Sequence, residues 1–143
     1  MAVEVTEATK ATADLVEAFE RLTPQLSSSN PPPSAEALGA IAASEATRLL
    51  VARSNGTIVG SLTLVLVRIP TGIRAIIEDV VVDEQCRGQG VGQLLNEAAL
   101  ELARDAGAVT VDLTSRPSRE AANRLYLRLG FVIRDTNVYR YTL

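Results

Sequence analysis

Hydrophobic and polar residues follow two different periods along this chain. Helices are predicted where apolar residues recur every three to four positions: 8–22, 35–43, 91–106 and 119–129. Strands are predicted where apolar residues alternate or run together: 3–5, 48–53, 57–68, 73–82 and 109–113, with a final hairpin over 131–133 and 138–142. Several hairpins and one β-α-β crossover predict an α+β fold, in which helices flank a mixed, mostly antiparallel sheet.

Turn and cap residues separate these elements. Asn55-Gly56 is a strong hairpin signal, and Ser34 suits the N-cap of the second helix. Residues 27–33 (Ser-Ser-Ser-Asn-Pro-Pro-Pro) form either a plain linker or a surface segment that could move over a site. Along the third helix, the buried stripe is expected at Leu94, Leu95, Ala98, Ala99 and Leu102.

Length and composition limit the class of protein. The 143 residues are 47% apolar and 22% charged with a net charge of −3, which predicts one globular domain over 1–143. No basic stripe and no membrane-length apolar run is present, so neither nucleic acid nor a membrane is an expected partner. The first residues lack the pattern of a signal peptide, which favours a cytoplasmic location. Histidine is absent and Cys86 is the single cysteine, so we expect no metal site and treat Cys86 as a packing residue.

A glycine-rich turn lies between the strand at 73–82 and the helix at 91–106. Its sequence is Arg87-Gly88-Gln89-Gly90-Val91-Gly92. Glycines that open a helix expose main-chain N–H groups to a phosphate. A nucleoside-triphosphate P-loop would need Lys-Ser or Lys-Thr next, and a dinucleotide fingerprint needs one more residue between its last two glycines. The remaining pattern, Arg/Gln-x-x-Gly-x-Gly/Ala, is matched by Arg87, Gly90 and Gly92.

A second motif lies downstream. Ala122 and residues 125–131 (Leu-Tyr-Leu-Arg-Leu-Gly-Phe) fit A-x-x-L-Y-x-x-x-G-F, at a suitable distance from residues 80–92. In both motifs the chain resembles the GCN5-related N-acetyltransferase (GNAT) superfamily, whose members bind acetyl-CoA. The strong match covers about 76–131. The resemblance implies the GNAT fold and acetyl-CoA as the acyl-donor substrate.

The resemblance also implies which residues hold this substrate. Main-chain N–H groups of the glycine turn would hold the pyrophosphate: Arg87, Gly88, Gln89, Gly90, Val91 and Gly92. The preceding strand would bond the pantetheine amides through its main chain: Val80, Val81 and Val82. Many members carry asparagine seven residues before the signature tyrosine, where this chain has Arg119. Arg119 either pairs with a cofactor phosphate or is a solvated first-turn residue.

Three residues are candidates for acid–base catalysis. In the family, the residue matching Tyr126 protonates the leaving thiolate; the alternative is that its ring only packs on the cofactor arm. Without histidine, the best base candidates are Glu78 and Asp79. Strict strand alternation would put them on opposite faces, with Glu78 on the face of Val80 and Val82. We expect Glu78 to act through water, unless its carboxylate only binds the acceptor cation or a salt-bridge partner.

The expected function is transfer of an acetyl group from acetyl-CoA to a primary amine by direct attack. The acceptor is a small-molecule or peptide amine, and the acidic residues at 78, 79, 83 and 84 hint that it is cationic, although Asp83 and Glu84 are expected to face solvent. One alternative is a non-catalytic CoA-binding or sensor domain of the same fold. Another is an interaction protein whose hairpin edges serve dimerisation. A homodimer is expected from the family alone.

Overall fold

The computed structural model describes residues 2–143, which divide into two compact units. The first unit ends at Leu113 and the second comprises Thr114–Leu143. No helix among the described residues has the length and apolar character needed to cross a membrane. A single domain over 1–143 stays a prediction.

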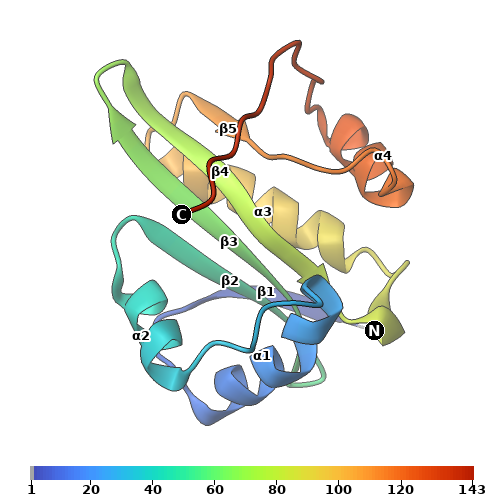
Figure 1. Cartoon of the computed structure of the whole chain (residues 1–143). Coiled ribbons are helices and arrows are strands. Elements are labelled where there is room, and N and C mark those ends of the chain that lie inside the picture. The colour runs from blue at the N-terminus through green and yellow to red at the C-terminus, as the bar shows by residue number, and fades with distance from the viewer. Residues whose placement is uncertain (1) are drawn as a thin grey trace. The chain divides into compact units, whose positions relative to one another are not determined.

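The first unit contains one five-stranded sheet. Its strands are β1 (Val3–Ala8), β2 (Thr47–Ser54), β3 (Thr57–Ile69), β4 (Gly72–Val82) and β5 (Thr110–Asp112), hydrogen-bonded in that order (Figure 1). The pairs from β1 to β4 are antiparallel, and β5 is parallel to β4. The α+β class with a mixed, mostly antiparallel sheet is confirmed. Asn55 and Gly56 form the predicted β2–β3 turn with φ of +52° and +81°.

Helices cover both faces of this sheet. The helices α1 (Ala13–Leu26) and α2 (Ala35–Ala43) lie on one face (Figure 1). Their residues Leu15, Leu22 and Leu38 form one buried cluster with Leu49 and Val51 of β2. Ser34 caps α2 as predicted, because its Oγ accepts a hydrogen bond of 3.1 Å from the Ala37 N–H. On the opposite face lies α3 (Val91–Asp105), which follows the short 3₁₀ helix η1 (Glu84–Cys86) (Figure 1).

The α1 helix extends four residues beyond its predicted end at Leu22. It continues through Pro24 to Leu26. Pro24 has no N–H for the carbonyl of Glu20, but both residues are exposed, so water can replace the lost donor. The extra turn carries Gln25, whose side chain reaches Glu84 at the start of η1, just before the glycine turn.

The predicted buried stripe of α3 is wrong in part. The buried positions are Val91, Leu95, Asn96, Ala99 and Ala103, whereas Leu94 is 40% exposed. Gly60 of β3 explains the close packing, because a Cβ there would lie 3.1 Å from Val91 Cγ1 and 3.2 Å from Leu95 Cδ1. The face of α3 that packs on the sheet is therefore the one that fits closely against Gly60. It is not the face with the largest apolar side chains.

The strand predicted at 109–113 is shorter and more exposed than expected. It forms over Thr110–Asp112, where Thr110 and Asp112 are exposed and Val111 is half-buried. β5 is the last strand of the sheet, and among residues 2–143 it pairs only with β4. No strand in this part of the chain lies on its other side.

The second unit consists of α4 (Glu120–Leu129) and the segments on either side of it. Gly130 ends α4 with φ of +104°, as predicted. The predicted final hairpin does not form, since residues 131–143 contain no strand. Val132, Val138 and Tyr139 are 82%, 76% and 88% exposed, so these apolar side chains are not packed against the rest of the protein. A two-stranded hairpin without such packing is only marginally stable.

Candidate functional site

A row of free main-chain donors surrounds the start of α3. Gly90 is the N-cap of this 15-residue helix, no side chain caps it, and no acidic residue lies in its first turn. Within residues 2–143, no N–H from Arg87 to Gln93 donates to a protein acceptor. We call these N–H groups the amide row (Arg87–Gln93). Such a row at the positive end of a helix dipole is suited to bind an anion.

Two glycines give the amide row its shape. Gly88 and Gly90 have φ of +77° and +82°, in the left-handed region that glycine adopts at low cost. A Cβ at either position would meet no atom within 4 Å, so the space beside them is open. The Arg87 side chain turns back, and its Nε donates to the carbonyl of Val82 at 3.3 Å. Its main-chain N–H stays in the amide row.

A β-bulge interrupts β4 at Asp79, which has φ of +50°. Thr63 of β3 pairs with Glu78 but Ser61 pairs with Val81, so β4 contains one extra residue between the two pairs. Glu78 therefore lies on the face of Val81. The predicted sharing of a face with Val80 and Val82 is wrong, because the bulge breaks strict alternation.

The outer edge of β4 is open beside the bulge. β5 pairs only with Arg74, Ala75 and Ile76, and the described residues place no strand against this edge from Ile77 to Val82. Val80 and Val82 are half-buried and Val81 is buried, so their side chains belong mainly to the packing. Their main chain leaves an edge to which an extended ligand can add, and this edge leads through η1 into the amide row.

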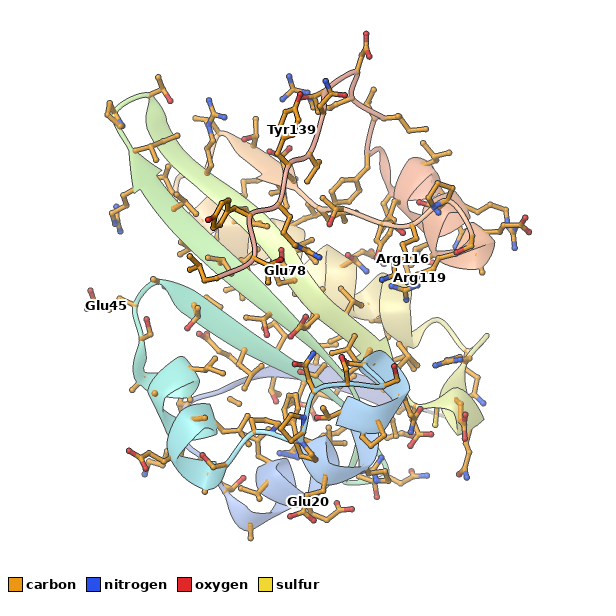
Figure 2. The ribbon with its side chains drawn as sticks, in the orientation of Figure 1. Glu20, Glu45, Glu78, Arg116, Arg119 and Tyr139 are labelled. Atoms are coloured by element: carbon orange, nitrogen blue, oxygen red, sulfur yellow. The ribbon has the colours of Figure 1, made fainter. Side chains whose placement is uncertain are left out.

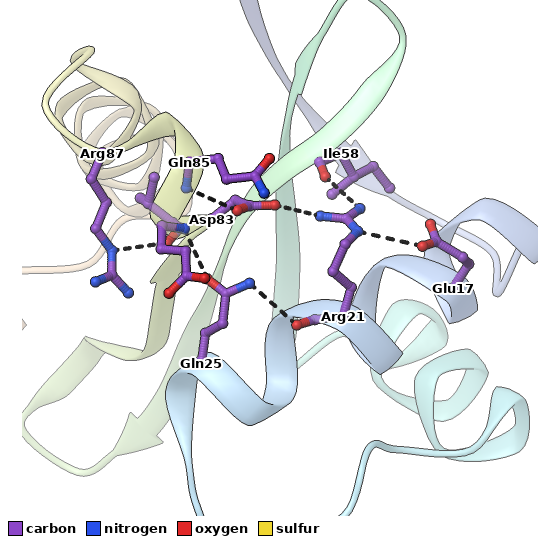
Figure 3. Close-up of polar contacts among 9 residues, drawn as sticks. Glu17, Arg21, Gln25, Ile58, Asp83, Gln85 and Arg87 are labelled. Atoms are coloured by element: carbon purple, nitrogen blue, oxygen red, sulfur yellow. Dashed lines mark hydrogen bonds and ion pairs between the residues drawn. The ribbon is translucent and has the colours of Figure 1, made fainter.

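The four acidic residues at this end of β4 have different surroundings. Glu78 and Asp79 are exposed, and Figure 2 shows Glu78 on β4. Asp83 was expected to face solvent, but it is buried and its Oδ2 lies 2.8 Å from Nη1 of Arg21 (Figure 3). Asp83 is therefore committed to an ion pair, whereas Glu84 is exposed as expected, so the accessible carboxylates are those of Glu78, Asp79 and Glu84.

Tyr126 belongs to the second unit, on the buried face of α4. It is 8% exposed, and its ring meets that of Phe131 edge to face, with centroids 5.7 Å apart. Burial raises the pKa of the Tyr126 phenol above its ordinary value, and Arg119 acts in the opposite direction. The phenol thus stays protonated at neutral pH and can donate a proton.

Arg119 is the N-cap of α4, and Figure 2 shows it together with Arg116 at the start of this helix. Its guanidinium makes no ion pair or hydrogen bond with residues 2–143. The carbonyls of Arg116 and Arg119 each accept a hydrogen bond of 2.9 Å from Nδ2 of Asn123. Asn123 thus orders the segment before α4, while the Arg119 side chain stays exposed.

Sequence reasoning missed the residues that anchor the turn before the amide row. Arg21 and Gln25 of α1 contact residues that are 62 and 59 positions away in the chain. Their spacing of four residues places them on one side of a helix, but this pattern does not identify the partner. Only the folded structure brings α1 to the turn after β4.

The sequence of the chain matches a known protein family. The family model for the acetyltransferase (GNAT) family matches residues 13–131. The chain belongs to the GNAT family. This confirms the resemblance found in the two motifs.

Curated GNAT relatives match parts of the chain. N-alpha-acetyltransferase 30 of Schizosaccharomyces pombe is 36% identical over 73 residues, which cover 51% of this chain and 48% of the relative. Glucosamine 6-phosphate N-acetyltransferase of Trypanosoma brucei brucei is 38% identical over 88 residues, covering 59% and 58%. The chain thus spans about half the length of these GNAT relatives.

A solved GNAT structure matches over nearly the whole chain. The Trypanosoma brucei acetyltransferase superposes with a TM-score of 0.80 at 29% identity, covering 99% of this chain and 100% of that one. The GNAT fold expected from the motifs is therefore confirmed.

Proposed function

We propose that this GNAT protein transfers an acetyl group from acetyl-CoA to a primary amine. The observation that carries the proposal is the pair of free main-chain surfaces, the open edge of β4 and the amide row, which the hydrogen-bonded turn over 83–86 connects. The β4 edge around Val80, Val81 and Val82 suits the amides of a pantetheine arm, which would add as an extended strand. The amide row suits the pyrophosphate, because its donors are unpaired and the space beside Gly88 and Gly90 is open.

The reaction requires two proton movements. The amine nitrogen forms a bond to the acetyl carbonyl carbon, the carbon–sulfur bond breaks, and the sulfur takes a proton. We assign that proton to Tyr126, whose raised pKa keeps its phenol protonated. The amine must lose a proton, and we assign its removal to Glu78 acting through water, supported by its exposure beside the bulge.

The acceptor is proposed only as a small-molecule or peptide amine. The curated relatives have different names, an N-alpha-acetyltransferase in one case and a glucosamine 6-phosphate N-acetyltransferase in the other, so they do not point to one acceptor. Isothermal titration with CoA tests the donor site, and release of CoA from acetyl-CoA across a panel of amines tests the reaction. Binding without turnover of any amine would support a CoA sensor instead. Absence of binding at high micromolar CoA would contradict the donor site.

Glu78→Gln is expected to lower kcat/KM for the amine about tenfold near pH 7, a modest loss for a general base acting through water. The loss should shrink toward pH 10, because an amine with a pKa near ~10.4 is then increasingly neutral without help. Initial rates across this pH range measure both effects.

Asp79→Asn is the matched control for Glu78→Gln, because asparagine tolerates the positive φ that Asp79 adopts. A larger loss of kcat/KM in Asp79→Asn than in Glu78→Gln would identify Asp79 as the base. A loss in Glu78→Gln that is equal at every pH would mean that Glu78 only binds the acceptor cation.

Arg119→Gln is expected to raise the Kd for CoA about three- to tenfold, as for loss of one contact between a charged side chain and a phosphate. The reason is that Arg119 is exposed, has no acidic partner among residues 2–143 and sits at a helix end that favours anions. Arg128→Gln, at the other end of α4, is the control. Titration calorimetry at two salt concentrations measures the effect; an unchanged Kd would identify Arg119 as a solvated surface residue.

A further inference from the structure

Arg21 of α1 holds the residue that precedes η1. Its Nη1 lies 2.8 Å from Asp83 Oδ2, and its Nη2 donates to the carbonyl of Ile58 at 2.9 Å (Figure 3). The side chains of Arg21 and Asp83 are 31% and 12% exposed, so this pair is largely removed from water. The contact of Arg21 with Glu17 is longer, 3.4 Å, and Glu17 is 63% exposed, which makes it peripheral.

The second oxygen of Asp83 shapes the turn. Asp83 Oδ1 accepts a hydrogen bond of 3.1 Å from the Gln85 N–H, and the Asp83 carbonyl accepts one of 2.8 Å from the Cys86 N–H. Because Arg21 fixes one oxygen of the carboxylate, it also orients the other. The ion pair thus acts on the main chain of η1.

Gln25 adds a second connection one helical turn further along α1. Its Oε1 accepts a hydrogen bond of 2.8 Å from the Glu84 N–H, and its Nε2 donates to the carbonyl of Arg21 at 3.3 Å (Figure 3). We call Arg21, Gln25 and Asp83 the loop clamp. The N–H groups of Glu84 and Gln85 both donate hydrogen bonds to side chains of the clamp. This network therefore ends just before the amide row begins.

We propose that Arg21 and Gln25 are positioning residues that hold the amide row in its binding conformation and couple it to α1. This inference rests on the proposed CoA function. A preorganised loop costs less ordering when a ligand binds. Because coupling is reciprocal, a ligand on the amide row also stabilises the last turn of α1.

Gln25→Ala tests the clamp, since it removes the acceptor for the Glu84 N–H and leaves the Arg21–Asp83 pair intact. Its Kd for CoA is expected to rise about three- to tenfold, as for loss of one preorganising hydrogen bond. KM for acetyl-CoA should rise with it, while kcat stays within about twofold. Arg21→Lys should give a smaller rise, because the lysine ammonium can keep the ion pair with Asp83 and loses only the second contact, with the Ile58 carbonyl.

Hydrogen exchange supplies a readout that turnover does not. In the wild type, CoA is expected to slow amide exchange at Thr23, Gln25 and Leu26 of α1, and this slowing should be absent in Gln25→Ala. Glu17→Gln is the control, because Glu17 contacts Arg21 but not the turn over 83–86. Its Kd for CoA and its amide exchange in α1 should match those of the wild type.

The outcomes separate the two proposals. A Gln25→Ala variant that binds CoA like the wild type, with the same slowing of exchange in α1, would overturn the coupling and leave the CoA site standing. A wild type that does not bind CoA would overturn the proposed function and this inference together. A rise in Kd in Glu17→Gln equal to that in Gln25→Ala would also overturn the specific role of the loop contact.

Discussion

Gly90→Ala is expected to raise the Kd for CoA at least about tenfold, which corresponds to about 1.4 kcal/mol of binding energy. Gly90 has φ of +82° at the N-cap of α3, where an alanine costs roughly 1–2 kcal/mol of conformational strain. Relief of this strain would turn the N–H groups of the amide row away from their common direction. In addition, the methyl group would enter the open space in which we place the pyrophosphate. Titration calorimetry measures the loss.

Gly56→Ala is the matched control for this variant. Gly56 has nearly the same φ, +81°, and the same absence of neighbours within 4 Å, but it lies in the β2–β3 turn. Both variants should therefore lose a similar amount of thermal stability. Only Gly90→Ala should lose affinity for CoA. If both variants bind CoA like the wild type, the amide row is not the pyrophosphate site.

The features that could be predicted from the sequence are those set by local chemistry. Asn55-Gly56 specifies a tight hairpin because both residues tolerate positive φ, and Ser34 specifies a helix start because its hydroxyl accepts from a free N–H. The glycine turn before α3 belongs to the same class. Its glycines at the start of a helix indicated an anion site, the absence of a following lysine excluded a P-loop, and the structure has the free amide row there.

The features that could not be predicted depend on residues distant in the chain. The bulge at Asp79 arises from the pairing of β4 with β3, and the simple period of two therefore assigned Glu78 to the wrong face. Asp83 looked like a solvent-facing acid because its partner, Arg21, is on α1. The predicted hairpin over 131–133 and 138–142 had the right residue pattern, but alternation alone does not supply a surface on which to pack.

Tyr126→Phe is expected to lower kcat about 10- to 100-fold with little change in KM for acetyl-CoA, if the phenol is the general acid. The expected loss lies at the low end for acid catalysis, because a leaving thiolate with a pKa near ~8.5 departs fairly readily without a proton. The phenylalanine ring preserves the edge-to-face contact with Phe131, so the variant removes the hydroxyl and keeps the packing. Tyr139→Phe, at an 88% exposed position, is the control and should behave like the wild type.

The pH dependence provides the sharper test of Tyr126. Burial raises the pKa of its phenol, so the wild-type rate should not fall through ionisation of this group between pH 7 and 9. Arg119 lowers the same pKa, and in Arg119→Gln any alkaline fall in kcat should therefore move to higher pH. In Tyr126→Phe that fall should disappear, since no phenol is left to ionise at this position. An alkaline fall that persists unchanged in Tyr126→Phe, together with a wild-type kcat, would mean that Tyr126 only packs.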